Sequence, residues 1–187
     1  MNLKGILDIN KTISKDLFKE TNYPWEVLPY IKDYIITLGN NLMIVERGNK
    51  GVIMINIGGH YDITLGNTLD KDNYTEIEEH IWVGSNVEID KLSTIIAPCI
   101  IDDNTIIRPG AYIRGNAIIG KNCVIGNSTE IKNSIIFDNC QLPHYNYVGD
   151  SILGYHVHLG AGVILSNLKN DSTNIDIKYK GKKLPTG

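Results

Sequence analysis

One aliphatic residue recurs at every sixth position through the second half of this 187-residue chain. Only two of the fourteen steps in the series contain five residues instead of six. The fifteen positions, which we call the inward series, are Val83, Ile89, Ile95, Ile101, Ile107, Ile113, Ile119, Ile125, Ile131, Ile136, Leu142, Val148, Leu153, Leu159 and Leu165. A period of this length predicts a chain wound into repeated coils, with one residue removed from a corner at each short step.

Two further positions of this six-residue repeat, which we call the hexad, show the same period. Four residues after members of the series, side chains are mostly small or β-branched and predict a second inward position: Val87, Ser93, Cys99, Thr105, Ala111, Ala117, Cys123, Thr129, Ile135, Cys140, Asn146, Ile152, Val157 and Val163. Three residues after members stand types that tolerate a left-handed backbone: Asn86, Asn104, Gly110, Asn116, Asn122, Asn139 and Gly162. Each hexad therefore predicts a short strand followed by a tight corner.

Three such hexads close one triangular coil of about 18 residues, and parallel strands stack about 4.8 Å apart. The fold class predicted is an all-β repeat, a parallel β-helix of about five coils over residues 80–168. Residues 1–79 predict a small α+β cap, and residues 169–187 a polar tail in which we recognise no cap. We expect the cap to cover the exposed amino-terminal edge of the β-helix.

The cap sequence predicts two short helices and a hairpin. The helices are separated near Pro24, and the second runs from Trp25 to a stop near Gly39. The hairpin turns around residues 48–51.

Composition excludes several classes of protein. A net charge of -3 provides no basic stripe, so we expect no nucleic-acid partner. The amino end lacks a signal-peptide core, and no apolar run is long enough to span a membrane, which predicts a cytoplasmic protein. The three cysteines, Cys99, Cys123 and Cys140, are odd in number and fall on small inward positions, so we interpret them as core residues.

The spacing places one group of polar side chains on a single face. The strands that end at Ile113, Ile131 and Val148 align on successive coils, so Tyr112 and Tyr147 point outward from the same face. Glu130 joins them on the coil between.

The two edges of this face carry titratable side chains. Turns that begin at Arg108, Gly126 and Pro143 form one edge and place His144 there, and the other edge carries Arg114 and Lys132. Cations of this kind bind anionic small molecules, and an imidazole exchanges protons near neutral pH. The alternative is that these residues are ordinary solvated corners.

The motifs in this region resemble a known family. Between Glu79 and Asn167 the chain contains, in order, RPGA, GN.TE.K, H..Y.GD, LGAG and SN. This ordered set resembles the left-handed β-helix acetyltransferase domain of the bifunctional enzyme that makes UDP-N-acetylglucosamine, and the shorter sugar-phosphate nucleotidyltransferase-like proteins related to it. The resemblance implies a left-handed β-helix and a homotrimer with sites between neighbouring subunits.

The resemblance also implies roles for single residues. His144 is the general base that deprotonates an amino-sugar nitrogen as it attacks an acetyl thioester. Arg108, Lys132 and Tyr147 hold the sugar phosphate. Asn167 contacts the sugar or the acyl group. Acetyl-coenzyme A is the implied co-substrate, and no metal is expected.

The chain departs from the family in three respects, which concern the acyl pocket, UDP-sugar synthesis and the coenzyme A site. His158 stands where the family has an asparagine in its NIGAG run, and we count it with the substrate-binding residues; Leu168 replaces an aromatic. No Gly-rich phosphate loop precedes the repeats, so we expect no UDP-sugar synthesis. In the family, later coils supply much of the coenzyme A site, and we expect no counterpart of them after the SN motif.

These observations leave three functional hypotheses. The leading one is an acetyl- or acyltransferase that moves an acyl group from coenzyme A to an amino-sugar phosphate or similar nucleophile. The second is a non-catalytic β-helix that binds a sugar phosphate or a partner protein. The third is a zinc enzyme like the γ-class carbonic anhydrases, for which His144, His156 and His158 are the candidate ligands, although their spacing differs from that family's.

Overall fold

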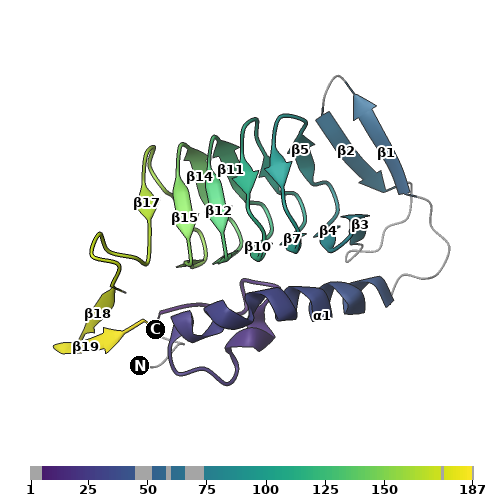
Figure 1. The fold of residues 1–187 in the computed structure, drawn as a ribbon. Coiled ribbons are helices and arrows are strands. Elements are labelled where there is room, and N and C mark those ends of the chain that lie inside the picture. The colour runs from purple at the N-terminus through teal and green to yellow at the C-terminus, as the bar shows by residue number, and fades with distance from the viewer. Residues whose placement is uncertain (1–5, 45–51, 58–59, 66–73, 174, 187) are drawn as a thin grey trace.

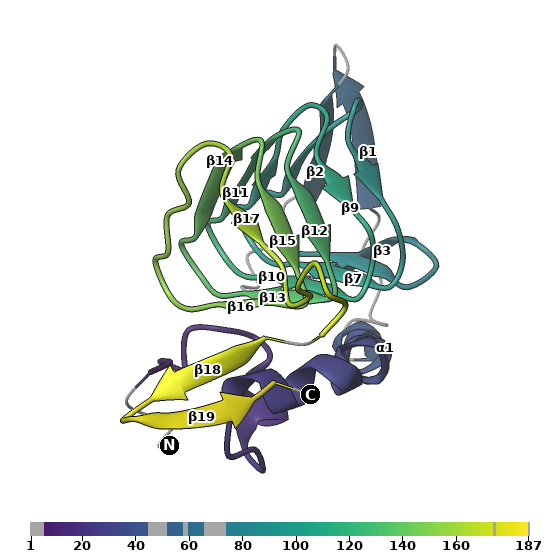
Figure 2. The same cartoon turned by 60° about the vertical axis from the view of Figure 1, so that its left-hand side comes forward.

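The computed structural model describes residues 6–44, 52–57, 60–65, 74–173 and 175–186. Most of them form a parallel β-helix of about five coils, which is triangular when viewed along its axis (Figures 1 and 2). An α-helix and a β-hairpin from the first half of the chain accompany it. The predicted fold class is therefore confirmed.

Three sheets form the three faces of the β-helix, and we name them sheets A, B and C. Sheet A contains β1 (Val52–Ile57), β2 (His60–Leu65), β5 (Glu88–Asp90), β8 (Ile106–Ile107), β11 (Val124–Asn127) and β14 (Gln141–His144). Sheet B contains β3 (Thr75–Glu78), β4 (Ile81–Val83), β7 (Cys99–Ile101), β10 (Ala117–Ile119), β13 (Ser134–Ile136) and β16 (Ile152–Leu153). Sheet C contains β6 (Thr94–Ile95), β9 (Tyr112–Ile113), β12 (Glu130–Lys132), β15 (Tyr147–Gly149) and β17 (Ile164–Leu165).

The inward series forms the core of the β-helix. All fifteen positions belong to one hydrophobic cluster, with Ile95 and Leu165 only partly buried. Cys99, Cys123 and Cys140 are buried in the same cluster as free thiols. The seven predicted corner residues all have positive φ angles, between 50° and 77°. The hexad pattern thus predicted both the core and the corners.

Two predicted inward residues point the other way. Ile135 and Ile152 belong to a second cluster outside the β-helix. Ser134 takes the inward position instead of Ile135, as its pairing with the inward-facing Ala117 shows. In each five-residue step the missing residue comes from the turn directly after the preceding member of the series. The second inward position therefore stands two residues before the next member, and counting four forward overshoots it by one.

Antiparallel strands begin two of the three sheets. Strand β2 pairs with β5 in sheet A, and β3 pairs with β4 in sheet B. The expected cover of the amino-terminal edge is present for these two sheets. The predicted hairpin turn at 48–51 lies outside the described residues, and the hairpin that the structure describes joins β1 to β2.

The helical segments pack along sheet B and not across the end of the β-helix (Figure 2). They are the 3₁₀-helices η2 (Lys15–Phe18) and η3 (Pro24–Tyr30) and the α-helix α1 (Ile31–Ile44). Their buried side chains meet the outward residues of sheet B in the second cluster, which includes Phe18, Val27, Ile31, Ile35, Trp82, Ile100, Ile118, Ile135 and Phe137.

The predicted bounds of the second helix are wrong. Residues Trp25–Tyr30 are 3₁₀ rather than α-helical, and Pro29 lies inside this segment, where it has no N–H to donate. Helix α1 then continues past Gly39 to Ile44. A Cβ atom at Gly39 would lie 2.3 Å from the Trp82 ring, so this glycine permits close packing on sheet B and does not end the helix.

The carboxyl-terminal segment is not a plain polar tail. Strands β18 (Asp176–Tyr179) and β19 (Lys182–Pro185) form an antiparallel hairpin that lies beside the amino-terminal segment (Figure 1). The division of the chain at residues 79 and 168 remains a prediction. Among the described residues, no helix is both long and apolar enough to cross a membrane.

Candidate functional site

Three columns of corners connect the sheets, and the candidate residues other than Tyr147 and His158 lie in them. The A–C corner comprises residues 108–111, 126–129 and 143–146; the C–B corner comprises residues 114–116, 132–133, 149–151 and 166–168; the B–A corner comprises residues 102–105, 120–123 and 137–140.

His144 is exposed on a well-anchored backbone at the A–C corner, where β14 ends. The N–H of Tyr145 donates to the Asn127 carbonyl at 2.9 Å, and the N–H of Gly162 donates to the His144 carbonyl at 3.3 Å. Beneath the corner, the buried amide of Asn146 donates to the Gly160 carbonyl at 2.7 Å. The coils below and above thus fix the backbone while the imidazole faces outward.

Arg108 lies in the same column, two coils below Pro143. Stacking at about 4.8 Å per coil places their backbones roughly 10 Å apart. Gly126 stands between them, and a Cβ there would lie 1.6 Å from the Pro143 carbonyl oxygen, so the intervening coil has no side chain at this point. Within the described part of the chain, no ion pair involves Arg108. The A–C corner therefore combines an exposed imidazole with a guanidinium that has no acidic partner there.

The cations at the C–B corner differ, because each is paired with an acid. Lys132 Nζ lies 3.1 Å from Asp150 Oδ2, and Asn133 donates to the other oxygen of Asp150 at 2.8 Å. Arg114 donates to Glu130 at 2.7 Å, and this hydrogen bond raises the pKa of Arg114. An anionic ligand at this corner has to compete with, or share, these carboxylates.

Tyr147 and Asn167 also belong to the C–B side. A Cβ atom on Gly149 would lie 2.6 Å from the Tyr147 hydroxyl, so the ring lies back along its own strand toward this corner. Asn167 lines a cleft of about 540 Å³ together with Asp150, Trp25 and Leu165.

The candidate residues therefore fall into separate groups within one chain. His144 and Arg108 occupy one edge of sheet C, whereas Lys132, Tyr147 and Asn167 occupy the other. Five residues lie between His144 and Asp150, which places the two edges roughly 15 Å apart. His158 is on sheet A, next to Gln141, with 3.3 Å between Nδ1 and the amide oxygen.

Comparisons with known proteins agree with the motifs. Residues 95–179 match the family model described as the GMPPB C-terminal domain. A bifunctional sugar-1-phosphate nucleotidylyltransferase/acetyltransferase of Sulfurisphaera tokodaii is 37% identical over 54 residues, which are 29% of this chain and 14% of that protein. The bifunctional protein GlmU of Lactobacillus johnsonii is 35% identical over 134 residues, which are 70% of this chain and 28% of that protein. The β-helix of this chain is related to theirs.

Other relatives match a shorter stretch. The bifunctional protein GlmU of Methanococcus maripaludis strain C5 is 45% identical over 49 residues, or 26% of this chain and 12% of that protein. The chain thus spans at most 28% of the length of these three relatives. The resemblance inferred from the motifs is confirmed, because the β-helix of this chain is similar to the parts of these relatives that it matches.

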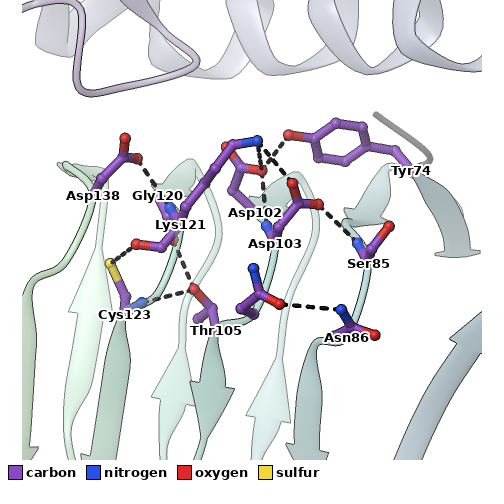
Figure 3. A network of polar contacts seen from close by, with 11 residues as sticks. Tyr74, Ser85, Asn86, Asp102, Asp103, Thr105, Gly120, Lys121, Cys123 and Asp138 are labelled. Carbon is purple, nitrogen blue, oxygen red and sulfur yellow. Dashed lines mark hydrogen bonds and ion pairs between the residues drawn. The ribbon is translucent and has the colours of Figure 1, made fainter. Parts of the chain in front are cut away.

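The structure identifies site residues that the sequence analysis did not select. Asp150 holds both Lys132 and Asn133, and it was visible as the aspartate of the H..Y.GD motif. A second polar network lies at the B–A corner around Asp102, Asp103 and Lys121 (Figure 3). Its only signal was the aspartate two residues after Ile101, Asp103, which recurs two coils later as Asp138, two residues after Ile136.

The histidines give the zinc hypothesis no support. Among the residues that the structure describes, no three His, Cys, Asp or Glu side chains are grouped so that they could hold a metal ion. His156 stands at the next coil of the B–A side, with its ring tilted by 37° against that of Tyr155 at 5.8 Å between centroids, and is therefore not beside His144.

Proposed function

We propose that this protein is an acyltransferase that moves an acetyl group from coenzyme A to the nitrogen of an amino-sugar phosphate or a similar small nucleophile. The observation that carries the proposal is the A–C corner of the acetyltransferase-related β-helix, where an exposed His144 stands on an anchored backbone, one residue beyond the register position of Arg108.

In this reaction His144 is the general base. A ring nitrogen of the imidazole accepts a proton from the acceptor amine as that nitrogen attacks the thioester carbonyl. The new C–N bond forms, the C–S bond breaks, and the coenzyme leaves as a thiolate that takes up a proton. A base that is fixed by its backbone and reaches solvent with its ring suits a small diffusing acceptor.

The acceptor's phosphate is assigned to the cations. Arg108 has no acidic partner among the described residues, so its guanidinium is available to bind phosphate through paired hydrogen bonds. Lys132 and Tyr147 contribute from the C–B corner, where Asp150 keeps the ammonium group oriented.

The acyl donor is assigned to the side of Asn167. The cleft that contains this residue is mainly apolar, through Trp25, Leu165 and Ile164, and has a polar rim at Asp150. These residues suit a flexible thioester arm, with the Asn167 amide near its carbonyl. His158 lies on sheet A beside Gln141, away from this cleft, so we assign it to substrate binding on the His144 side of the chain and not to the donor cleft.

The separation of the two groups argues for a site built from two chains. His144 and Lys132 lie on opposite edges of sheet C, so one chain does not bring them around a single sugar phosphate. A homotrimer in which the A–C corner of one subunit faces the C–B corner of the next removes the separation. We propose this assembly, with cytoplasmic location, as part of the function.

The decisive experiment measures thiol release from acetyl-coenzyme A with glucosamine 1-phosphate as acceptor. His144→Ala should lower kcat/KM by about 10² to 10⁴, the usual contribution of a general base. His156→Ala is the matched control, because it removes another exposed corner histidine and should retain wild-type rates. Equal rates in wild type and His144→Ala would remove His144 as the base. Phosphate-dependent sugar binding without turnover in the wild type would instead favour the non-catalytic alternative.

A further inference from the structure

A second cleft lies at the B–A corner, on the opposite side of sheet A from His144. It has a volume of about 530 Å³ and lies between the helical segment and the β-helix, lined by Asn10, Thr12, Ile13, Asn41, Leu42, Tyr74, Asp102, Lys121 and Asp138. Volumes of this size are typical of small-molecule sites. The acyl-transfer proposal uses none of these residues.

Asp102 is the central side chain of this cleft, and it is almost fully buried, with 1% of its surface exposed. Its Oδ1 atom accepts hydrogen bonds from the Tyr74 hydroxyl at 2.5 Å and from the Asp103 N–H at 2.8 Å (Figure 3). Its Oδ2 atom is buried with no hydrogen-bond partner among the residues that the structure describes. One oxygen of a buried carboxylate therefore lacks the donor that such atoms nearly always have.

A buried acceptor without a donor is costly, by about 1 to 3 kcal/mol and more when it is charged. Burial also raises the pKa of Asp102 to about 6, with the hydrogen bond from Tyr74 acting in the opposite direction. The carboxylate is thus mostly ionised at neutral pH in a place where its second oxygen gains nothing from the protein. A bound donor would remove this cost.

The charges around the cleft favour a cation. Lys121 Nζ is 2.7 Å from Asp103 Oδ2 and 3.8 Å from Asp102 Oδ1, so its charge is shared with Asp103. Asp138 adds another carboxylate, whose Oδ1 accepts from the Lys121 N–H at 3.0 Å. Three carboxylates and one ammonium group leave a net negative site.

The donor set distinguishes an organic cation from a metal ion. In the described part of the chain, no three acidic, histidine or cysteine side chains are arranged to ligate a metal. The remaining polar lining consists of neutral groups, from Asn10, Thr12 and Asn41, whose oxygens accept hydrogen bonds from N–H and O–H donors. We propose that this cleft binds a small organic ammonium compound, whose N–H groups donate to Asp102 Oδ2 and to the Asp138 carboxylate.

The test uses the full chain and 1,4-diaminobutane as the probe, with 1,4-butanediol as its neutral counterpart. Calorimetric titration at constant ionic strength should show saturable binding of the diamine below about 10 mM and none of the diol. Asp138→Asn and Asp102→Asn should each weaken binding by about tenfold or more, because both variants remove a charge. Each retains an Oδ1 acceptor for the hydrogen bonds seen now.

Asp171→Asn is the matched control, since it removes an exposed carboxylate from the tail, and it should bind the diamine like wild type. If Asp102→Asn does not fold, Asp138→Asn decides, because its side chain is only half-buried. The proposal is overturned if the diamine does not saturate, if the diol binds equally well, or if the two cleft variants retain wild-type affinity.

Discussion

Sheets B and C are built from the same hexad, yet their outer faces have opposite characters. Outward positions on sheet B are occupied by Trp82, Ile100, Ile118, Ile135 and Ile152, and the helical segments cover them. The equivalent column on sheet C contains Thr94, Tyr112, Glu130, Tyr147 and Ile164, and no helix of the described chain packs on it. The inward series determines the coiled fold, and the outward residues determine whether helical segments cover a face.

This difference separates stability from function. Side chains on sheet B hold the cap to the β-helix, and substitutions there should destabilise the fold. Side chains on sheet C and its two edges are partly exposed and carry the charges proposed to bind substrate. Substitutions there should alter activity while the fold persists. Four predictions test this separation.

The largest effect is expected from truncation of the covered face. Ile118 on β10 is fully buried on the side that α1 covers, so Ile118→Ala should lower the free energy of unfolding by about 4 kcal/mol through lost burial and a cavity. Ile164, which is 71% exposed on sheet C, is the matched control, and Ile164→Ala should change it by less than about 0.5 kcal/mol. Urea unfolding of both variants measures the contrast. Similar losses in the two would contradict the assignment of the faces.

The second-largest expected effect is a pH dependence of the free energy of unfolding, caused by Asp102 at the B–A corner. Because burial raises the pKa of Asp102 from 3.8 to about 6, the folded state binds more protons than the unfolded state between these values. This contribution is therefore complete below pH 4 and is lost as the pH rises through 6, by up to about 3 kcal/mol. Asp102→Asn should remove that part of the slope when unfolding is measured from pH 4 to 8. Parallel curves for wild type and variant would contradict the prediction.

A smaller loss of stability is expected from Gly39→Ala, although a glycine-to-alanine substitution usually stabilises a helix. Alanine normally stabilises a helix interior relative to glycine by about 1 kcal/mol. A Cβ atom at Gly39 would overlap the Trp82 ring at 2.3 Å, so Gly39→Ala should destabilise the protein by about 2 kcal/mol. Gly160→Ala is the control, because nothing lies within 4 Å of the added Cβ. A rise in Tm for Gly39→Ala would show that α1 does not pack on Trp82 as described.

The smallest change in stability is expected at the C–B corner. Lys132 and Asp150 form a partly exposed ion pair, so Lys132→Gln should alter the free energy of unfolding by less than about 1 kcal/mol. The same variant should raise KM for the sugar phosphate several-fold, because it removes a phosphate-binding charge. Unchanged KM together with a large loss of stability would reverse the roles assigned to the two faces.

The hexad pattern predicted the β-helix well, because its signal is local and repeated. Inward residues, corner asparagines and the alignment of Tyr112 with Tyr147 follow from counting alone. Counting failed at Ile135 and Ile152, since the sequence does not say which side of a short step loses its residue. It also failed at Gly39, which resembles a helix end unless the position of Trp82 is known.

The polar sites were predicted less completely. His144 and Arg108 share a column because the repeat places them there, and their common corner was visible in the spacing. The grouping of Tyr147 with Lys132 depends on how its ring lies across Gly149, which is a matter of side-chain packing. The Asp102 network depends on Tyr74, a residue outside the repeat, so no period connects the two.

The central claim is that the two edges of sheet C act together, with the A–C corner of one subunit and the C–B corner of the next forming one site. The most direct test is the acetyl-transfer rate of a mixed assembly, made by refolding His144→Ala and Lys132→Gln chains together in equal amounts. At sub-saturating sugar phosphate, His144→Ala alone should be nearly inactive and Lys132→Gln alone should be several-fold slower than wild type. Random mixed assemblies should exceed the average of these two rates by up to about a quarter of wild-type activity, since one site in four pairs an intact His144 with an intact Lys132. A mixture no more active than the average of the two separate variants would contradict a shared site.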